Sequence, residues 1–554
     1  MAVKEEASDV HVKNELVEEG NVDQHRNVEL HRALKSRHIT MIAIGGAIGT
    51  GLIIGTGEAL AKAGPGSILI SYAAVGFIVY LVMCGLGEMA AWLPLGSGFT
   101  GYSVRFCDPA LGFAIGYTYW FKYIIVTPNQ LTAAAMVISF WVDTERINPG
   151  VWITIFLVVI VLINYVGVRF FGEFEFWLSS FKVIVIIGLI LLCFILMLGG
   201  GPDHDRKGFR YWKNPGAFNT YIDDGAPGRF YAFWSTMVSA TFAYLGTELV
   251  GVTVGEAQNP RKTIPRAIKL TFYRILFFYV LSVLLLGTLV PYNSPELASA
   301  TNSSNSNSAA ASPFVVAIKL ATIPVLPHIV NACILIFVFS AANSDLYIAT
   351  RTIYGLSREG KAPAFLSWTD NRGVPIYSLG LCSLIACIAY MNVSSDSQTV
   401  FGYFVDLVTI FGLLTWISLL VTHIFFVRAR KAQNVPESDL AYTAPFGVGG
   451  SYFALVFCVI IALTKSYDVF THSPEWGNFD YKTFITAYLG IPLYLMLIFG
   501  YKVFTGCKRV KPEEADLWTG KEEIDREEAE YLAVQAMREP KGGWFYEKFV
   551  SWLF

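Results

Sequence analysis

A dense group of glycines interrupts the first apolar stretch of this chain. Six glycines fall within thirteen residues of GGAIGTGLIIGTG, in a segment (39–60) that is otherwise apolar enough to cross a membrane. A glycine in a helix interior costs about 1 kcal/mol relative to alanine, so six together predict a helix that breaks or is closely approached. A broken helix in lipid is tolerated only where its freed backbone groups face protein, water or a ligand. This segment is therefore a candidate binding site.

Twelve apolar stretches predict an all-α membrane protein. Only 15% of the residues are charged, whereas a soluble domain carries about 25%. A net charge of -2 does not indicate nucleic acid as a partner. The predicted spans are 39–60, 67–93, 110–141, 150–168, 178–200, 231–255, 267–291, 318–350, 375–392, 399–427, 451–471 and 482–505.

The distribution of basic residues predicts that both termini are cytoplasmic. The first forty residues are polar and do not resemble a signal peptide, so the first span is expected to direct insertion. With the N-terminus inside, the cytoplasmic loops carry arginine and lysine, whereas the external loops 293–312 and 393–398 carry neither. The external loop 201–230 is an exception. The serine-rich loop 293–312 is predicted to lack structure of its own. Asn302 and Asn392 lie in glycosylation sequons on external loops.

A second glycine interruption appears in the sixth predicted span. The sequence FAYLGTELVGVTVGE (242–256) breaks an apolar run and adds a carboxylate, Glu248. Interrupted helices at matching positions of two halves indicate a transporter built from inverted repeats. The free N–H groups of one half-helix suit a carboxylate, and the opposed carbonyl groups suit an ammonium group. Such a site would bind a zwitterion, and an amino acid is the obvious candidate.

Several motifs identify the family that the chain resembles. They are IGGAIGTGL (44–52), AGPGS (63–67), GEMAAWLP (87–94), DPALGFAIGYTYWF (108–121), EFEFWLSSFKV (173–183), TELVGVTVGEAQNPRKTIPRAI (247–268) and SAANSDLYIATRTIYGLSREGKAPAF (340–365). Over residues 35–510 the chain resembles a fungal amino-acid permease of the amino acid–polyamine–organocation superfamily. The segment GGGPDHDRKGFRYW (199–212) looks most like the dicarboxylic, or acidic, amino-acid permeases.

The resemblance implies a fold of twelve helices, with helices 1–5 and 6–10 as inverted repeats and helices 1 and 6 broken. The expected parts are a disordered cytoplasmic tail (1–38), the first repeat with the external loop after it (39–230), the second repeat (231–428), two further helices (429–505) and a cytoplasmic C-terminal tail (506–554).

The resemblance also implies which residues bind the substrate. The α-carboxylate is expected on backbone N–H groups of the first interruption, and the α-ammonium on carbonyls of the second. The substrate-binding residues of these segments are expected to be Ile48, Gly49, Thr50, Gly51, Phe242, Ala243, Tyr244 and Leu245, together with Thr409 on the tenth span. The alternative for the first segment is helix packing, because Gly45/Gly49 and Gly51/Gly55 form GxxxG pairs.

Lys122 and Gln130 on the third span are the candidates for substrate selection. A lysine in hydrocarbon is costly by at least roughly 2.5–3.5 kcal/mol, so Lys122 should face a cavity or a partner unless it snorkels to the headgroups. In the resembling permeases for basic or neutral amino acids, the position of Lys122 is usually small or polar. Many of them have glutamate at the position of Gln130. Adding a cation and removing an anion would favour a substrate with a side-chain carboxylate.

Two residues are the candidates for proton coupling. Lys182 on the fifth span either snorkels or occupies the place that a sodium ion fills in sodium-driven relatives, where burial would let it exchange a proton. Glu248 is an intramembrane carboxylate beside a helix break, which is a functional hypothesis by default. Asp345 and Asp406 are weaker candidates of the same kind, and His423 is expected to be structural.

The predicted function is import of L-aspartate and L-glutamate with at least two protons across the plasma membrane. The open alternatives are a broad-range or neutral permease and a non-transporting amino-acid sensor. No hydrolase motif, metal-binding spacing or cofactor motif is present, so neither an enzyme nor a cofactor is expected. The resemblance also implies that the N-terminal tail, with Lys4 and Lys13, is a site for ubiquitin-ligase machinery. The last residues are expected to form an amphipathic helix and an aromatic membrane contact.

Overall fold

The computed structural model describes residues 48–95, 98–252, 260–301, 312–393, 397–470 and 479–536, and these residues form helices and no strands. The helices of the first half are η2 (Gly51–Gly55), α3 (Thr56–Trp92), α4 (Gly98–Phe106), α5 (Pro109–Ile138), α6 (Pro149–Val166), α7 (Val168–Met197), η3 (Trp212–Gly216), α8 (Gly225–Tyr244) and α9 (Leu249–Val252). They continue as α10 (Pro260–Arg274), η5 (Ile275–Val280), α11 (Leu281–Leu289), α12 (Pro295–Thr301), α13 (Pro313–Leu320), α14 (Leu326–Arg358), η6 (Ala364–Ser367), α15 (Ile376–Ala386) and η7 (Cys387–Val393). The last are α16 (Ser397–Ala432), η8 (Glu437–Asp439), α17 (Gly447–Thr464), η9 (Tyr467–Phe470), α18 (Tyr481–Tyr488), α19 (Gly490–Thr505) and α20 (Lys521–Ala536).

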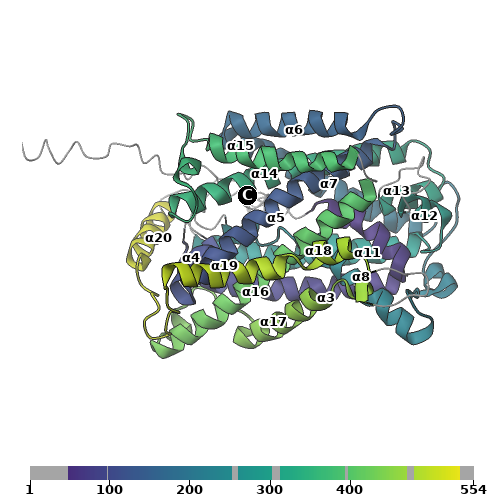
Figure 1. Ribbon diagram of the computed structural model, residues 1–554. Helices are drawn as coiled ribbons and strands as arrows, with labels where there is room; N and C mark the ends of the chain where they lie inside the picture. Colours follow the sequence, from purple (N-terminus) through teal and green to yellow (C-terminus); the bar gives the residue numbers. More distant parts are fainter. Residues whose placement is uncertain are drawn as a thin grey trace, which may run out of the picture.

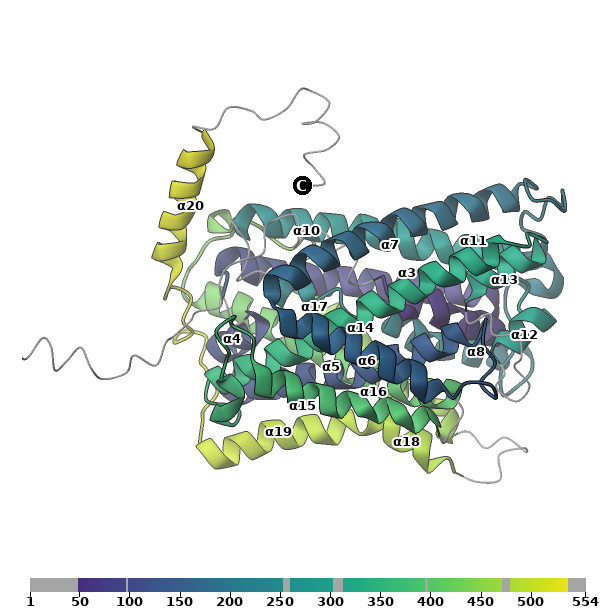
Figure 2. The same ribbon diagram turned by 90° about the horizontal axis from the view of Figure 1, so that it is seen from above.

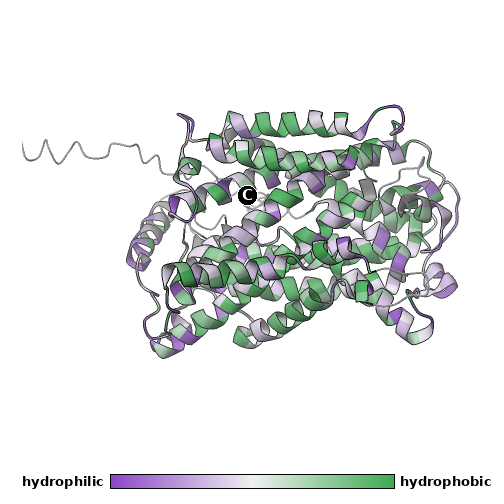
Figure 3. Cartoon of the chain, in the orientation of Figure 1, coloured by the Kyte–Doolittle hydropathy of each residue, from purple (hydrophilic) through white to green (hydrophobic). Residues whose placement is uncertain are grey.

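The long helices lie side by side in an elongated bundle. In both Figure 1 and Figure 2, α4 and α20 lie at one end of the bundle and α12 and α13 at the other. Apolar residues dominate the helices between the ends, whereas hydrophilic residues gather along α20 (Figure 3). This distribution is that of a protein whose middle faces lipid and whose ends face water.

A sharp bend divides α3 where the sequence predicts the first and second spans to separate. Gly64 has a φ of 80° there, and Pro65 begins the second part of the helix. A loop segment fills the bend, because the amide of Gly66 donates to the carbonyl of Ala217 at 2.7 Å. A side chain on Gly64 would also lie 2.9 Å from that carbonyl oxygen, so glycine is required on two grounds.

The two predicted interruptions lie against each other. Residues Gly51–Gly55 form a single π-helical turn, and α8 ends at Tyr244 because Leu245 is extended and Gly246 has a φ of 94°. A Cβ atom on Gly51 would lie 2.5 Å from the Cα atom of Ala243. The glycine at position 51 therefore allows one interrupted helix to touch the backbone of the other. The residues before Ile48, including part of the glycine cluster, lie outside the described residues.

Helix α5 forms the wall behind this contact. Its start follows from the sequence, since Asp108 accepts a hydrogen bond from the amide of Ala110 at 2.9 Å and Pro109 occupies the first turn. The helix continues through Pro128 to Ile138, and it packs against α14 and α16. Lys122 and Gln130 are thereby placed beside the two interruptions.

Helices occupy all twelve predicted spans, but the number of membrane crossings stays a prediction. Eight helices in the described part of the chain are long and apolar enough to cross a membrane, or nine if α18 and α19, bent by 42°, form one span. The run Gly51–Trp92 counts as one of these although Gly64 divides it. The domain boundaries likewise stay predictions.

Two loop assignments and one sequon need correction. The loop 293–312 was expected to lack structure, but Pro295–Thr301 is helical because proline followed by a glutamate suits a first turn. Its residues 302–311, with the sequon of Asn302, lie outside the described residues. The loop 201–230 ends early, because α8 begins at Gly225. The sequon residue Asn392 is only 3% exposed, so its amide is not presented for glycosylation.

The C-terminal segment 508–536, here called the C-terminal strap, closes one end of the bundle. The Gln433 side chain donates to the carbonyl of Ala515 at 2.7 Å, and the Trp92 indole donates to the carbonyl of Leu517 at 2.9 Å. Leu517 is fully buried. The strap therefore joins the ends of α3 and α16. Helix α20 confirms that part of this segment is helical, but its amphipathic character stays a prediction, and residues 537–554 and the N-terminal tail lie outside the described residues.

Replacing Arg261 with alanine is expected to release α20 without affecting substrate binding. Arg261 donates to Asp525 and to Glu528 of the strap. Each such half-exposed ion pair contributes only about 0.2–1 kcal/mol, so local opening should increase severalfold while global stability changes little. Hydrogen exchange over residues 521–536 measures this. The matched control is Lys511→Ala, which removes an exposed pair with Glu514.

The same contact predicts the pH dependence of the strap. Burial raises the pKa of Asp525, but hydrogen bonds from Lys521 and Arg261 outweigh it and hold the pKa below the ordinary value of 3.8. A carboxyl whose pKa is lowered in the docked state stabilises docking above 3.8, and this contribution is lost as the pH falls through the lowered pKa. Protection of α20 should thus be constant from neutral pH down to about 5.

Candidate functional site

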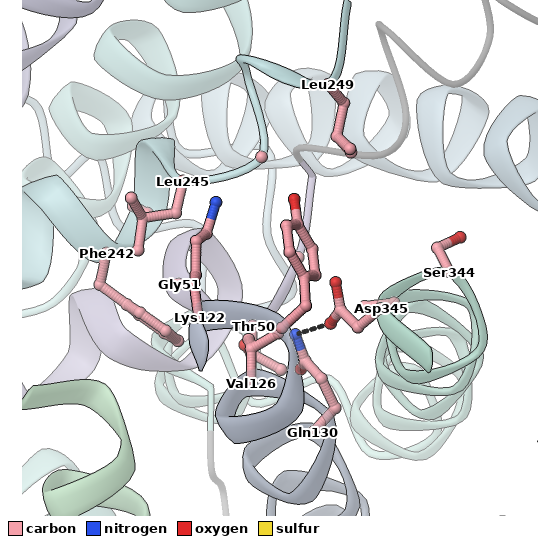
Figure 4. Close-up of a pocket in the computed structure, with 15 residues that line it drawn as sticks. Thr50, Gly51, Lys122, Val126, Gln130, Phe242, Leu245, Leu249, Ser344 and Asp345 are labelled. Carbon is pink, nitrogen blue, oxygen red and sulfur yellow. Dashed lines mark hydrogen bonds between the residues drawn. The ribbon is translucent and has the colours of Figure 1, made fainter. Parts of the chain in front are cut away.

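A small cavity lies where the two interrupted helices meet α5 and α14. Its volume is about 40 Å³, which holds a few water molecules but not an amino acid. Figure 4 shows Phe242 and Leu245 on one side of it and Asp345 on the opposite side. The lining residues are Gly49, Thr50, Gly51, Lys122, Tyr123, Val126, Gln130, Phe242, Ala243, Leu245, Gly246, Leu249, Ala341, Ser344 and Asp345. A larger ligand therefore requires side chains at this cavity to move.

Three buried polar atoms at the cavity have no hydrogen-bond partner among the residues that the structure describes. They are the hydroxyl groups of Thr50 and Ser344 and the side-chain carbonyl of Gln130. A buried polar group without a partner costs about 1–3 kcal/mol, and such groups are rare in native proteins. Their convergence on one cavity indicates that a ligand or ordered water supplies the missing hydrogen bonds.

Lys122 forms a buried ion pair across the helix break. Its Nζ atom donates to Glu248, and both side chains are almost completely buried. Glu248 also accepts from the Trp416 indole at 3.3 Å and from the amide of Gly246 at 3.2 Å. The ammonium group of Lys122 lies 4.7 Å from the ring centre of Tyr123. Lys122 therefore does not snorkel to the membrane surface.

Gln130 and Asp345 face each other across the cavity. The Gln130 side-chain amide donates to Asp345 at 3.2 Å, as Figure 4 shows. No lysine or arginine nitrogen lies within 4 Å of the Asp345 carboxylate in the described part of the chain. Asp345 had been only a weaker candidate from sequence. The signal that could have raised it is the motif SAANSD, which puts polar groups in an otherwise apolar span.

Lys182 is buried, so the alternative in which it snorkels is wrong. Its side chain is fully buried, and its Nζ atom lies 3.7 Å from Glu175 on the same helix, α7. Glu175 also accepts from the hydroxyl of Ser340 at 2.8 Å. Lys182 does not line the cavity. It contacts α14 through Glu175 and Ser340.

The structure brings together most of the predicted substrate-binding residues and leaves three of them outside the cavity, while the two proton-coupling candidates, Lys182 and Glu248, do not line it either. Gly49, Thr50, Gly51, Lys122, Gln130, Phe242, Ala243 and Leu245 line the cavity. Ile48 is buried in the apolar core, the hydroxyl of Tyr244 donates to the carbonyl of Tyr72 at 2.8 Å, and the hydroxyl of Thr409 donates to the carbonyl of Val405 at 2.6 Å. The sequence did not indicate Tyr123, Val126, Leu249 or Ser344, because apolar and hydroxyl residues on a span carry no distinguishing pattern.

A second, larger cavity of about 190 Å³, here called the outer cavity, also has Phe242 in its lining. Lys465 donates to Asp406 there at 3.1 Å, and Lys62 lies 4.0 Å from Asp468. Asp406 therefore belongs to this outer cavity and not to the site between the broken helices. Phe242 lines both cavities.

The arrangement of these helices is also found in a solved structure. The chain is similar to a mutant manganese transporter of Eremococcus coleocola, with a TM-score of 0.51 over 87% of this chain and 96% of that one. At 11% identity this similarity shows the fold alone. The all-α membrane fold with two broken helices that the sequence predicts is confirmed, whereas the count of twelve transmembrane helices stays a prediction.

The chain belongs to the amino acid permease family, whose profile matches residues 38–513. It is 55% identical to the dicarboxylic amino acid permease of Saccharomyces cerevisiae, over 95% of this chain and 87% of that protein. An uncharacterized amino-acid permease of Schizosaccharomyces pombe is 46% identical over 88% of this chain and 92% of that protein. The proline-specific permease of S. cerevisiae is 40% identical over 96% of this chain and 84% of that protein. The chain is thus a multi-pass membrane transporter, as predicted.

Proposed function

We propose that this protein imports aspartate and glutamate together with protons across the plasma membrane. The observation that carries the proposal is the cavity, where two interrupted helices and three unpartnered polar atoms lie beside a buried lysine. The 55% identity to a dicarboxylic amino acid permease supports the acidic substrates. The relative that is proline-specific is more distant, at 40% identity.

The α-carboxylate and α-ammonium groups, which all amino acids share, bind between the two interrupted helices. The substrate α-carboxylate accepts hydrogen bonds from the hydroxyl of Thr50 and from backbone N–H groups at the start of η2. Its α-ammonium group faces the backbone carbonyls of Ala243 and Leu245 at the end of α8. The carbonyl of Tyr244 is less suited, because it already accepts from the hydroxyl of Thr247 at 2.7 Å.

The second carboxylate of the substrate is selected by Lys122. This lysine is paired with Glu248, so an acidic substrate must compete with an existing carboxylate. Two like charges 4 Å apart interact unfavourably by about 4 kcal/mol at an effective dielectric constant of about 20. Protonation of Glu248 from the outer solution removes this repulsion and frees the ammonium group. Proton binding and binding of an acidic side chain are thereby coupled.

Glu248 is a better proton carrier than Lys182 on these grounds. Deprotonation of Lys182 would leave Glu175 buried without its cation, at 3.7 Å from the neutral amine. Protonation of Glu248 leaves Lys122 with a new anionic partner, the substrate. We therefore assign the proton that is exchanged in each cycle to Glu248.

The membrane potential sets the minimum number of protons. A potential that is negative inside opposes entry of an anion by about 2.3 kcal/mol per 100 mV. One proton per anion makes the cycle electroneutral, and a second lets the potential drive uptake. We propose at least two protons, both termini in the cytoplasm, and ubiquitin-ligase machinery as the partner of the N-terminal tail.

Uptake of labelled aspartate in a permease-deficient yeast tests the proposed function. Uptake should rise as the external pH falls from 7.5 to 5, and unlabelled glutamate should compete at least tenfold better than proline or alanine. Competition by neutral amino acids as strong as that by glutamate would exclude the acidic assignment. Uptake that is insensitive to pH and strictly dependent on internal amino acid would exclude proton symport.

A further inference from the structure

Around the cavity between the two interrupted helices, Asp345 is the one charged residue, among those that the structure describes, whose charge is not balanced by a neighbour within ion-pair distance. Lys122 is balanced by Glu248, and Lys182 is balanced by Glu175. Asp345 lines the cavity and accepts one side-chain hydrogen bond, from Gln130. With both pairs neutral in sum, an ionised Asp345 gives the cavity wall an excess negative charge.

We propose that Asp345 is a second proton-binding site of the transport cycle and that an acidic amino acid binds only after Asp345 is protonated. The inference rests on the proposed function, because it concerns an anionic substrate in the same cavity. The negative charge of the cavity wall would repel the anionic substrate. Protonation converts Asp345 into a neutral hydrogen-bond donor, and its O–H group then suits a carboxylate oxygen of the substrate.

The surroundings of Asp345 permit this role. The groups that face it from α5 are Lys122, Tyr119, Tyr123 and Gln130, and those from α7 are the paired Lys182 and Glu175. The break contributes Glu248, which is held by three donors. Of the three carboxylates Asp345, Glu175 and Glu248, Asp345 thus has the fewest hydrogen bonds to lose when its protonation state changes. Each proton taken up outside is released inside together with the substrate.

The charge moved per aspartate in proteoliposomes tests the proposal. In the wild type, two protons and one aspartate anion carry a net positive charge inward. Asp345→Asn should still take up aspartate, but with one proton fewer, so that the transport current disappears and the KM for aspartate keeps only the dependence on external pH that Glu248 confers. Asp345→Glu should keep the current. Glu58→Gln, at an exposed carboxylate that lines the outer cavity, is the control with the wild-type ratio.

Each result bears on the inference separately from the proposed function. If Asp345→Asn moves the wild-type charge per aspartate, the inference is wrong while proton symport stands. If the wild type itself moves no protons with aspartate, the proposed function fails instead. If Asp345→Asn is inactive, calorimetry of the purified protein in buffers of different ionisation enthalpy should show one proton fewer bound with aspartate. Loss of aspartate binding in both Asp345→Asn and Asp345→Glu would make Asp345 a structural residue and overturn the inference.

Discussion

Replacing Gly51 with alanine is expected to abolish aspartate uptake, with a loss of at least about a hundredfold. The added Cβ atom would lie 2.5 Å from the Cα atom and 2.9 Å from the nitrogen of Ala243. These are backbone atoms of α8, so they cannot turn aside as a flexible side chain would. The two interrupted helices must separate there, and both line the substrate cavity.

Gly55 provides the matched control for this substitution. It lies one turn along the same helix, and a Cβ atom there would meet only the Phe242 ring at 4.0 Å, which is an ordinary contact. Gly55→Ala should therefore transport aspartate at close to the wild-type rate. Uptake is normalised to the amount of each variant at the cell surface. Wild-type uptake by Gly51→Ala would refute the close approach of the two breaks.

Replacing Lys122 with methionine should both destabilise the protein and remove uptake of acidic amino acids. The substitution leaves Glu248 buried without its cation, and removing one partner of a buried ion pair costs about 3–5 kcal/mol. The unfolding temperature of the purified protein should fall accordingly. The KM for aspartate should rise far more than the KM of any neutral substrate, because only aspartate needs the ammonium group.

The double variant Lys122→Met with Glu248→Gln separates stability from selection. It has no unpaired charge, so its unfolding temperature should recover towards that of the wild type while aspartate uptake stays absent. Lys502→Met is the control for removing the lysine of an ion pair that is not buried, because Lys502 pairs with Asp108 at 2.5 Å but is 36% exposed. Aspartate uptake by the double variant with an unchanged KM would show that the ion pair only packs.

The sequence predicts the positions of the two interrupted helices correctly because its strongest signals are backbone signals. The glycines of the first break and the sequence FAYLGTE of the second predict where the helices are interrupted. Gly51 is needed because the backbone of Ala243 comes close to it, and Gly246 is needed because its φ is positive. These constraints act on the backbone and do not depend on which side chains meet. The same holds for Pro109 after Asp108 at the start of α5.

The partners of the buried charges could not be predicted in this way. Lys122 and Glu248 are 126 positions apart, and nothing in either segment indicates that they pair. Thr409 was expected at the site, but on α16 its hydroxyl is occupied by the carbonyl of Val405 one turn earlier. Which face of a buried helix meets the cavity depends on packing from several helices, and an all-round apolar span leaves that rotation undetermined.

The C-terminal strap also affects how the protein can be tagged for the measurements above. Removing the chain after residue 507 would expose the indole N–H of Trp92 and delete the fully buried Leu517. A fluorescent reporter or affinity tag fused at that point would replace these contacts with a mobile linker. A fusion placed beyond Ala536 keeps the whole strap, so surface counts and unfolding temperatures obtained with it refer to the intact transporter.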